Sequence, residues 1–374
     1  MGYAPASVEG PQEMANERAS DLLRRLSLAA GPPGAEDEVR ALVREALGAI
    51  GPVQHDRLGS VVCEKRGSAD TPRVLLASHL DEVAFLVQSI ARDGTLALAP
   101  LGGWWSHVLL GQRVDVLAAA GRRPGVIAAK PPHHLGAEER RQLLPLESMY
   151  VDLGASTRAE VEALGVRIGD PVVPAASFVE LAVPGVVSGK AFDDRVGVAL
   201  MCEALAGLAG RPHANTVVGL AAVQEEVGSR GARTAMELAR PDVALVLECS
   251  PADDFPGQAD PQARLGGGPQ IRFSDPTALA NRRLVRLLED VARAHDIPIQ
   301  LAVRRTGGTD AGPIHCSGSG VPTAVIGVPA RYIHSHVAVL RLDDQARALA
   351  LLLATIERLD AACVSRLTEF GTDA

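Results

Sequence analysis

The spacing of hydrophobic positions changes twice along the chain and divides it into three parts. Apolar residues recur at helical spacing over 22–28 and 39–50, and the GPPG turn at 31–34 separates these two predicted helices. A continuous apolar run then begins at residue 73 and predicts a strand buried on both faces, as in the middle of an α/β sheet. The sequence therefore opens as an α/β domain.

Between residues 84 and 178 the pattern is one of short strands. The runs TLALAP, QRVDVLA, PGVIAA, MYVDLG and DPVVPA are separated by Gly, Pro and Asp turns, and helical spacing is confined to the region around 157–164. This segment predicts a small β-barrel or sandwich inserted into the α/β domain.

Alternating strands and helices return after Lys190. We expect strands at 216–224, 243–249 and 323–329, with helices at 195–208, 281–295 and 343–359. The alternation predicts a mixed or mostly parallel sheet. The fold class is thus α/β: a mixed-sheet domain (17–83 and 179–374) with an inserted β-barrel-like domain (84–178). The polar, aperiodic residues 1–16 are expected to form a disordered leader.

Composition limits the kinds of partner that the protein can bind. The 374 residues carry a formal net charge of −8, and the basic residues are dispersed among acids, which argues against nucleic acid as a partner. The absence of 18 consecutive uncharged apolar residues argues against a membrane span. Five cysteines without a CxxC pair predict reduced thiols, mostly small buried hydrophobes, in a cytoplasmic protein.

Candidate metal ligands follow several of the predicted strands. His79 and Asp81 lie where the strand that begins at residue 73 should end, and ligands of open α/β sheets gather at such ends. A metal-bound imidazole is usually oriented by a hydrogen bond from its second ring nitrogen, which a nearby carboxylate can accept. We therefore expect His79 to bind a metal and Asp81 to orient it.

Two pairs of adjacent acids suggest the reactive groups. Asp193 and Asp194 precede a predicted helix, where we expect Asp193 to bridge two metals and Asp194 to cap the helix or support the site. Glu225 and Glu226 follow a buried strand, where neighbouring acids persist when a cation or a proton relieves their repulsion. One of these glutamates can bind a metal while the other acts as a general base.

Two further ligands complete the set. Glu248 ends the apolar run VALVLE and needs a partner of opposite charge, which a metal would provide. His334 follows the strand at 323–329 and is the best second imidazole, with His336 as its local competitor. Histidines and carboxylates in this number suit two adjacent metal ions that share one carboxylate, and they predict a two-metal hydrolase.

The motifs HLDEVAFLV, GKAFDDRVG, VQEEVGSRGA, GGTDAG and RYIHS, in this order and spacing, resemble the M42 family of metallo-aminopeptidases, which includes the tetrahedral and glutamyl aminopeptidases. The resemblance covers the chain from about Ala15 to Leu359 and implies that the mixed-sheet domain is a zinc-peptidase-type catalytic domain. It implies one metal on His79, Asp193 and Glu248, a second on Asp193, Glu226 and His334, Glu225 as the base and Asp81 as the residue that orients His79. Two positions depart from the family, which usually has Asp in place of Glu248 and Pro in place of His336.

The resemblance also implies the activity. We expect an aminopeptidase that removes N-terminal residues from short peptides with two divalent metals, zinc by default and cobalt or manganese as alternatives. A homo-oligomer such as a dodecamer, assembled partly through the inserted domain, is expected as well. Two other functions stay open: a metal-dependent amidohydrolase or deacylase on the same fold, and a catalytically silent peptide-binding scaffold.

Overall fold

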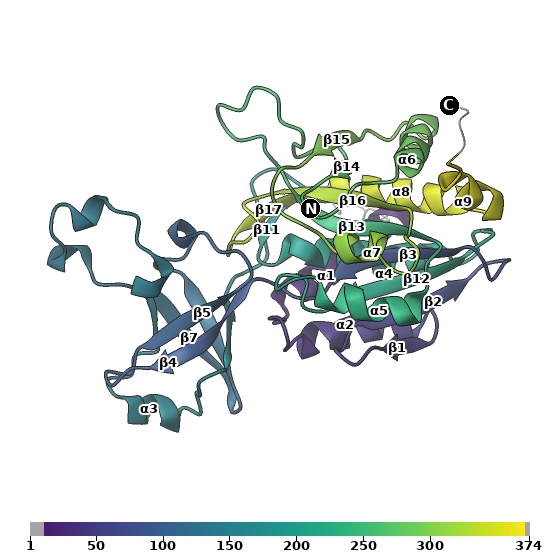
Figure 1. Cartoon of the computed structure of the whole chain (residues 1–374). Helices are drawn as coiled ribbons and strands as arrows, with labels where there is room; N and C mark the ends of the chain where they lie inside the picture. Colours follow the sequence, from purple (N-terminus) through teal and green to yellow (C-terminus); the bar gives the residue numbers. More distant parts are fainter. Residues whose placement is uncertain (1–10, 371–374) are drawn as a thin grey trace, which may run out of the picture.

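The computed structural model describes residues 11–370 of the chain, and residues 1–10 and 371–374 lie outside that description. The described chain forms a large α/β domain and a smaller six-stranded barrel that lies to one side of it (Figure 1). The predicted fold class is therefore confirmed. None of the helices in residues 11–370 is both long and apolar enough to cross a bilayer.

The α/β domain is built on an eleven-stranded mixed sheet. Its main path runs in the order β1-β2-β12-β3-β13-β16-β17-β11-β10, and β14 pairs with β16 and β15. The central strands β12, β3, β13 and β16 are parallel to one another, so their C-terminal ends meet at one edge. The strands are β1 (Val53–His55), β2 (Val61–Arg66), β3 (Arg73–His79), β10 (Val179–Glu180), β11 (Val186–Gly189), β12 (Thr216–Ala222), β13 (Val243–Pro251), β14 (Gln270–Ser274), β15 (Gln300–Val303), β16 (Thr323–Arg331) and β17 (Ala338–Arg341).

Helices cover both faces of this sheet. The larger core packs one face against α1 (Pro11–Leu28), α2 (Asp37–Gly48), α4 (Phe192–Gly207), α6 (Arg282–Ala294), α8 (Leu342–Arg358) and α9 (Ala361–Leu367). The smaller core packs the other face against α5 (Arg230–Ala239) and α7 (Ala311–His315). Residues in β12, β3, β13 and β16 contribute to both cores, which explains why their sequences are apolar without alternation.

The first helix begins earlier than the sequence analysis expects. Helix α1 starts at Pro11, so residues 11–16 of the expected leader 1–16 are helical, while the rest of that leader lies outside the described residues. Proline is favoured at the first position of a helix because its missing N–H needs no partner there. Apolar spacing did not reveal these turns because their residues are mostly polar.

The barrel closes in the order β4-β5-β8-β7-β6-β9. Its strands are β4 (Ala84–Ile90), β5 (Leu96–Leu101), β6 (Arg113–Ala118), β7 (Gly121–Ala128), β8 (Tyr150–Asp152) and β9 (Pro171–Pro174), with the short helix α3 (Arg158–Ala163). Four single-turn 3-10 helices lie at Ser106–Val108, Pro132–His134, Glu139–Arg141 and Leu146–Ser148. A separate apolar core, which includes Phe85 stacked on Trp104 at 4.8 Å between ring centroids, fills this domain.

The cysteines are unpaired, and most are buried as expected. Cys63, Cys202 and Cys249 lie in the larger core, whereas Cys363 is half-buried and Cys316 is exposed. The exposure of Cys316 differs from the expectation because this residue directly follows the short helix α7, at the turn before β16.

Glu203 is a polar residue within the helical layer and gives a test of the packing between α4 and α8. Its carboxylate accepts a 2.9 Å hydrogen bond from the amide nitrogen of Gln345, and burial raises the pKa of Glu203 to about 7 although this bond lowers it. The pKa of Glu203 is higher in the folded protein than in the unfolded chain. The contribution of protonated Glu203 to the free energy of unfolding is therefore fully present below about pH 4.5 and is lost as the pH rises through about 7.

We therefore expect Glu203→Gln to raise the melting temperature at pH 9 and to change it little at pH 5. The stabilisation at pH 9 should be on the order of 1–2 kcal/mol. The new amide can also donate to the oxygen of Gln345, which is buried without a hydrogen-bond partner. Thermal melts of both proteins at the two pH values measure the effect, and an equal shift at both would contradict it.

Candidate metal centre

The candidate metal ligands and their neighbours come from the edge at which the parallel strands end. His79 is the last residue of β3, and Glu248 lies near the end of β13. Glu225 and Glu226 follow β12, and His334 follows β16. Asp193 lies at the start of α4, directly after β11. The strand order thus brings together residues that are more than 250 positions apart in the sequence.

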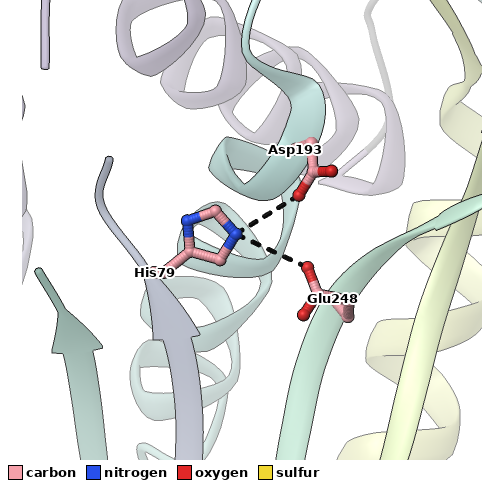
Figure 2. Close-up of side chains that lie close together, drawn as sticks. All are labelled: His79, Asp193 and Glu248. Atoms are coloured by element: carbon pink, nitrogen blue, oxygen red, sulfur yellow. Dashed lines mark hydrogen bonds and ion pairs between the residues drawn. The ribbon is translucent and has the colours of Figure 1, made fainter. Parts of the chain in front are cut away.

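The carboxylate of Asp193 lies between the two histidines. Its Oδ1 atom is 3.2 Å from Nε2 of His79, and its Oδ2 atom is 3.2 Å from Nε2 of His334. Figure 2 shows the first of these contacts, with the imidazole of His79 pointing toward both Asp193 and Glu248. One carboxylate therefore presents a separate oxygen to each imidazole.

Two groups of potential ligands share this aspartate. His79, Asp193 and Glu248 form the first group, and Asp193, Glu226 and His334 form the second; within each group the ligand atoms lie within 4.8 Å of one another. Glu248 Oε1 is 3.7 Å from His79 Nε2, and Glu226 Oε1 is 3.3 Å from His334 Nε2. All five residues were expected as metal ligands from the sequence.

Hydrogen bonds fix which nitrogen each histidine presents. Nδ1 of His79 lies 3.0 Å from the carbonyl oxygen of Asp81, and Nδ1 of His334 lies 2.7 Å from that of Gly103 in the loop after β5. A carbonyl oxygen only accepts, so Nδ1 must carry the proton in both rings. In each neutral ring the lone pair of Nε2 then faces carboxylate oxygens that also carry only lone pairs.

This donor set fits a cation. Burial lowers the pKa of His334, but the Asp193 and Glu226 carboxylates outweigh it and raise the pKa to about 11, so these carboxylates favour a positive charge at Nε2, either a proton or a cation bound to the neutral ring. Burial raises the pKa of Glu226 and Glu248, and Glu226 Oε1 is buried without a hydrogen-bond partner. Positive charge between these groups would satisfy the facing lone pairs and the unpartnered oxygen together.

Glu225 lies beside both groups without belonging to either. Its Oε2 atom is 3.9 Å from His79 Nε2, and its Oε1 atom accepts a 3.2 Å hydrogen bond from the hydroxyl of Ser229. Burial raises the pKa of Glu225 well above its ordinary value, partly opposed by His79. This environment is typical of a carboxylate that exchanges protons.

Asp81 contacts His79 through a different atom from the one expected. The carbonyl oxygen of Asp81 holds the imidazole, while its carboxylate oxygen Oδ1 lies 3.6 Å from Nδ1. The carboxylate instead accepts hydrogen bonds from the backbone N–H groups of Glu225 at 2.8 Å and Glu226 at 3.0 Å. A single buried residue thus positions both His79 and the turn that carries the two glutamates.

Two neighbouring candidates lie outside both groups. Asp194 accepts hydrogen bonds from the backbone N–H groups of His79 and Gly197, each at 3.1 Å, so it caps the helix and supports β3. His336 hydrogen-bonds through Nε2 to the carbonyl oxygen of Arg113 in the barrel, and burial lowers its pKa to about 4. His336 therefore does not compete with His334 in this geometry.

The family follows from a comparison with known sequences. Residues 59–351 match the family model described as M42 glutamyl aminopeptidase, and this range includes all five candidate ligands, Asp81 and Glu225. The chain belongs to the M42 family. This match confirms the family resemblance that the sequence motifs indicated. The protein is a hydrolase, because the M42 family consists of aminopeptidases.

Relatives named as aminopeptidases align along almost their whole length. The glutamyl aminopeptidase of Lactococcus lactis subsp. cremoris is 34% identical over 94% of this chain and 99% of the relative. The lysyl aminopeptidase of Pyrococcus furiosus is 32% identical over 91% of this chain and 97% of the relative. Two relatives with nearly equal identity to this chain are therefore named for substrates of opposite charge, one acidic and one basic.

Solved M42 structures share the fold. The TET aminopeptidase from Thaumarchaeota archaeon SCGC AB-539-E09 superposes with a TM-score of 0.92 at 43% identity and covers 94% of this chain and 99% of its own. The TET1 peptidase of Pyrococcus horikoshii, which can assemble into a tetrahedron or a large octahedral shell, superposes with a TM-score of 0.82 at 30% identity. That match covers 91% of this chain and 100% of the TET1 chain.

The sequence analysis did not reveal every residue around the candidate metal centre. The cavity above it has a volume of about 350 Å³ and is also lined by residues that sequence reasoning left without a role: Ser229, Arg272, Thr277, Arg304, Thr306 and Ile333. The GGTDAG segment contributes Gly307, Gly308 and Thr309 to the wall. The sequence analysis searched for histidines and acids at the ends of predicted strands. Arg272 and Arg304 do not fit that pattern, so it did not identify them.

The role of Asp81 is testable. Asp81→Asn leaves one oxygen for two backbone N–H groups and turns an amide toward the other, so the Glu225–Glu226 turn should shift. We expect kcat to fall about 10- to 100-fold, in line with the loss of one charge-assisted hydrogen bond. Steady-state kinetics with metal analysis on the same samples measure it.

Asp56→Asn is the matched control, because the Asp56 carboxylate also accepts backbone N–H groups, those of Leu58, Gly59 and Ser60, but does not line the cavity. It should lower the melting temperature while kcat stays the same. Equal kcat in the wild type and in Asp81→Asn would show that the turn does not depend on this carboxylate.

Proposed function

We propose that the chain is a dinuclear metal-dependent aminopeptidase that removes N-terminal residues from short peptides. The observation that carries this proposal is the position of the Asp193 carboxylate, whose two oxygens each face the Nε2 atom of a different histidine at 3.2 Å. A carboxylate shared in this way suits two neighbouring cations.

The proposed ligands divide between the two metals. One metal would be held by His79, Asp193 and Glu248, and the other by Asp193, Glu226 and His334. When bound, the two metals supply Lewis acidity that lowers the pKa of a water molecule and polarises the scissile carbonyl. Mixed imidazole and carboxylate ligands accept zinc, cobalt or manganese, and zinc is the default assignment.

Glu225 is assigned as the general base. Its buried carboxylate takes a proton from the attacking water and then delivers that proton to the leaving amine. The hydrogen bonds that the backbone N–H groups of Glu225 and Glu226 donate to the Asp81 carboxylate would hold the Glu225 carboxylate beside His79 during both transfers. Ser229 restricts Oε1 and leaves Oε2 directed toward the centre.

The cavity supports action on one terminal residue at a time. Its volume of about 350 Å³ lies at the small end of ligand pockets and accommodates an amino-acid side chain with part of the next residue.

Assembly is part of the proposal. Similarity to the self-assembling TET1 peptidase supports a homo-oligomer, such as a dodecamer, with the barrel (within 84–178) helping to form contacts or control access. Exposed apolar side chains near the sheet edge, among them Val183 and Val337 at 55% and 54% exposure, suit such contacts. Light scattering should report an oligomer, and a monomer at every concentration would overturn this part.

The unpaired cysteines fit a cytoplasmic location.

Metal dependence and the requirement for a free α-amine test the function together. Chelation should abolish hydrolysis of aminoacyl-p-nitroanilides, and zinc, cobalt or manganese should restore it. An N-acetylated substrate should not be cleaved. Preferred cleavage of the acetylated form would indicate an amidohydrolase or deacylase instead, and the absence of turnover with every metal and substrate would indicate a silent scaffold.

A further inference from the structure

The segment between β16 and β17 is hydrogen-bonded to the barrel at two points. Nδ1 of His334 donates to the carbonyl oxygen of Gly103 at 2.7 Å, in the loop after β5. Nε2 of His336 lies 2.9 Å from the carbonyl oxygen of Arg113, the first residue of β6. Because a carbonyl oxygen only accepts, Nε2 of His336 carries a proton and donates as well. One candidate ligand and its neighbour two positions away thus each bind a different part of the barrel.

The backbone of this segment is strained. Tyr332 and His334 have φ angles of 58° and 55°, in the left-handed region that residues other than glycine rarely adopt. The hydroxyl of Ser335 donates to the carbonyl oxygen of Tyr332 at 2.6 Å and closes the turn locally. Residues in such conformations persist where the surrounding structure holds them. Contacts from outside the segment are therefore needed to keep the imidazole of His334 in place.

His336 supplies a contact of this kind at the junction between the two domains. The residue is 2% exposed, and the centroid of its ring lies 6.3 Å from that of Trp104. The indole of Trp104 in turn donates from Nε1 to the carbonyl oxygen of Ala84 in β4 at 2.9 Å. Trp104 directly follows Gly103, so His336 lies beside the loop that orients the second candidate histidine.

The hydrogen bond to Arg113 is what distinguishes the imidazole from another ring at this position. Nδ1 of His336 is buried without a hydrogen-bond partner. An unpaired buried acceptor costs free energy, and a phenyl ring would occupy the same space without that cost. The favourable contribution that only the imidazole makes is therefore the donation from Nε2.

The barrel loop also reaches the other residue that belongs to the second ligand group alone. A Cβ atom at Gly102 would lie 3.0 Å from Oε2 of Glu226, and one at Gly103 would lie 3.4 Å from Nδ1 of His334. In the first ligand group, by contrast, Nδ1 of His79 is held by a backbone carbonyl oxygen just after β3. The barrel therefore supports the second group in particular.

We propose that His336 is a positioning residue for the second metal. Its hydrogen bond to Arg113 holds the segment between β16 and β17 against the barrel, and so keeps Nε2 of His334 directed toward the other ligands of its group. This inference rests on the proposed function. His336 acts through the backbone two residues away and binds no metal through Nε2, which already donates to Arg113.

Zinc-binding measurements on variants of His336 test the inference. His336→Phe keeps an aromatic ring but removes the donor, so the affinity for one of the two zinc ions should fall at least about tenfold while the other stays the same. His336→Gln retains an N–H donor on a side chain of similar reach and should keep both affinities. Competition with a chromophoric chelator measures the two affinities.

Ligand variants identify the zinc that is affected. In Glu248→Gln, which keeps the second group complete, the addition of His336→Phe should still weaken zinc binding at least about tenfold. In Glu226→Gln, which keeps the first group complete, the same addition should leave the affinity for the remaining zinc unchanged.

His213→Phe is the matched control. His213 is also a buried histidine, with Nδ1 3.0 Å from Oδ1 of Asn215, but it does not line the cavity. This variant should lower the melting temperature and keep both zinc affinities.

Thermal melts verify the folding of the His336 variants. If the phenyl ring prevents folding, His336→Leu, which also lacks the donor, takes the place of His336→Phe in every comparison. Wild-type zinc affinities in the variant without a donor, or an equal loss in His336→Gln, would overturn this inference and leave the aminopeptidase intact. A wild type that binds fewer than two zinc ions would overturn the proposed function itself.

Discussion

Replacement of Glu225 by Gln is expected to reduce kcat by about 10²- to 10⁴-fold, the range typical for loss of a general acid–base group. Glutamine keeps the shape of the side chain and the hydrogen bond to Ser229, but it cannot accept and release the proton. The metal content should remain that of the wild type, because Glu225 belongs to neither ligand group. Kinetics and elemental analysis on one preparation measure both quantities.

The separation between activity and metal content makes this variant informative. A low kcat with normal metal content supports the assigned role. A low kcat with lost metal would show that Glu225 is a ligand, and wild-type turnover would show that another group moves the proton. Glu289→Gln, an acidic position on α6 outside the cavity, serves as the control and should match the wild type in both measurements.

Replacement of Asp193 by Asn is expected to have the other large effect, on metal binding itself. The asparagine retains one oxygen ligand and places an NH₂ group, which only donates, where the second oxygen faces a histidine. Both ligand groups lose part of their set, so the metal content should fall from two per chain to less than one. Activity should fall with it by at least about 10³-fold.

Glu248→Gln gives the matched comparison for Asp193. Glu248 belongs to the first ligand group alone, so this variant should retain about one metal per chain, held by Asp193, Glu226 and His334. Titration with zinc, followed by removal of excess metal and elemental analysis, distinguishes the variants. Equal losses in Asp193→Asn and Glu248→Gln would contradict the shared role of Asp193.

The fold and the candidate ligand set were largely accessible from the sequence because both depend on strong local signals. Buried parallel strands carry continuous apolar runs, and the ends of such strands rarely tolerate charges without a partner. Glu225, Glu226 and Glu248 stood out for that reason, whereas His79 stood out because it lies where a buried strand was expected to end. The strand order, which the sequence does not state, is what brings them to a single point with His334.

Features that depend on packing between distant elements were not accessible. The carbonyl contact between Asp81 and His79 and the hydrogen bond from His334 to Gly103 of the barrel loop need the tertiary structure. His336 looked like a competing ligand because it is two residues from His334, yet its ring turns toward Arg113.

The direct test of the shared-carboxylate centre is anomalous diffraction from crystals loaded with zinc, with data collected on both sides of the zinc absorption edge. Two anomalous peaks should flank the Asp193 carboxylate, about 3.5–4 Å apart, one beside His79 and Glu248 and the other beside His334 and Glu226. A single peak, or peaks bound by other residues while Asp193 remains unligated, would contradict the account.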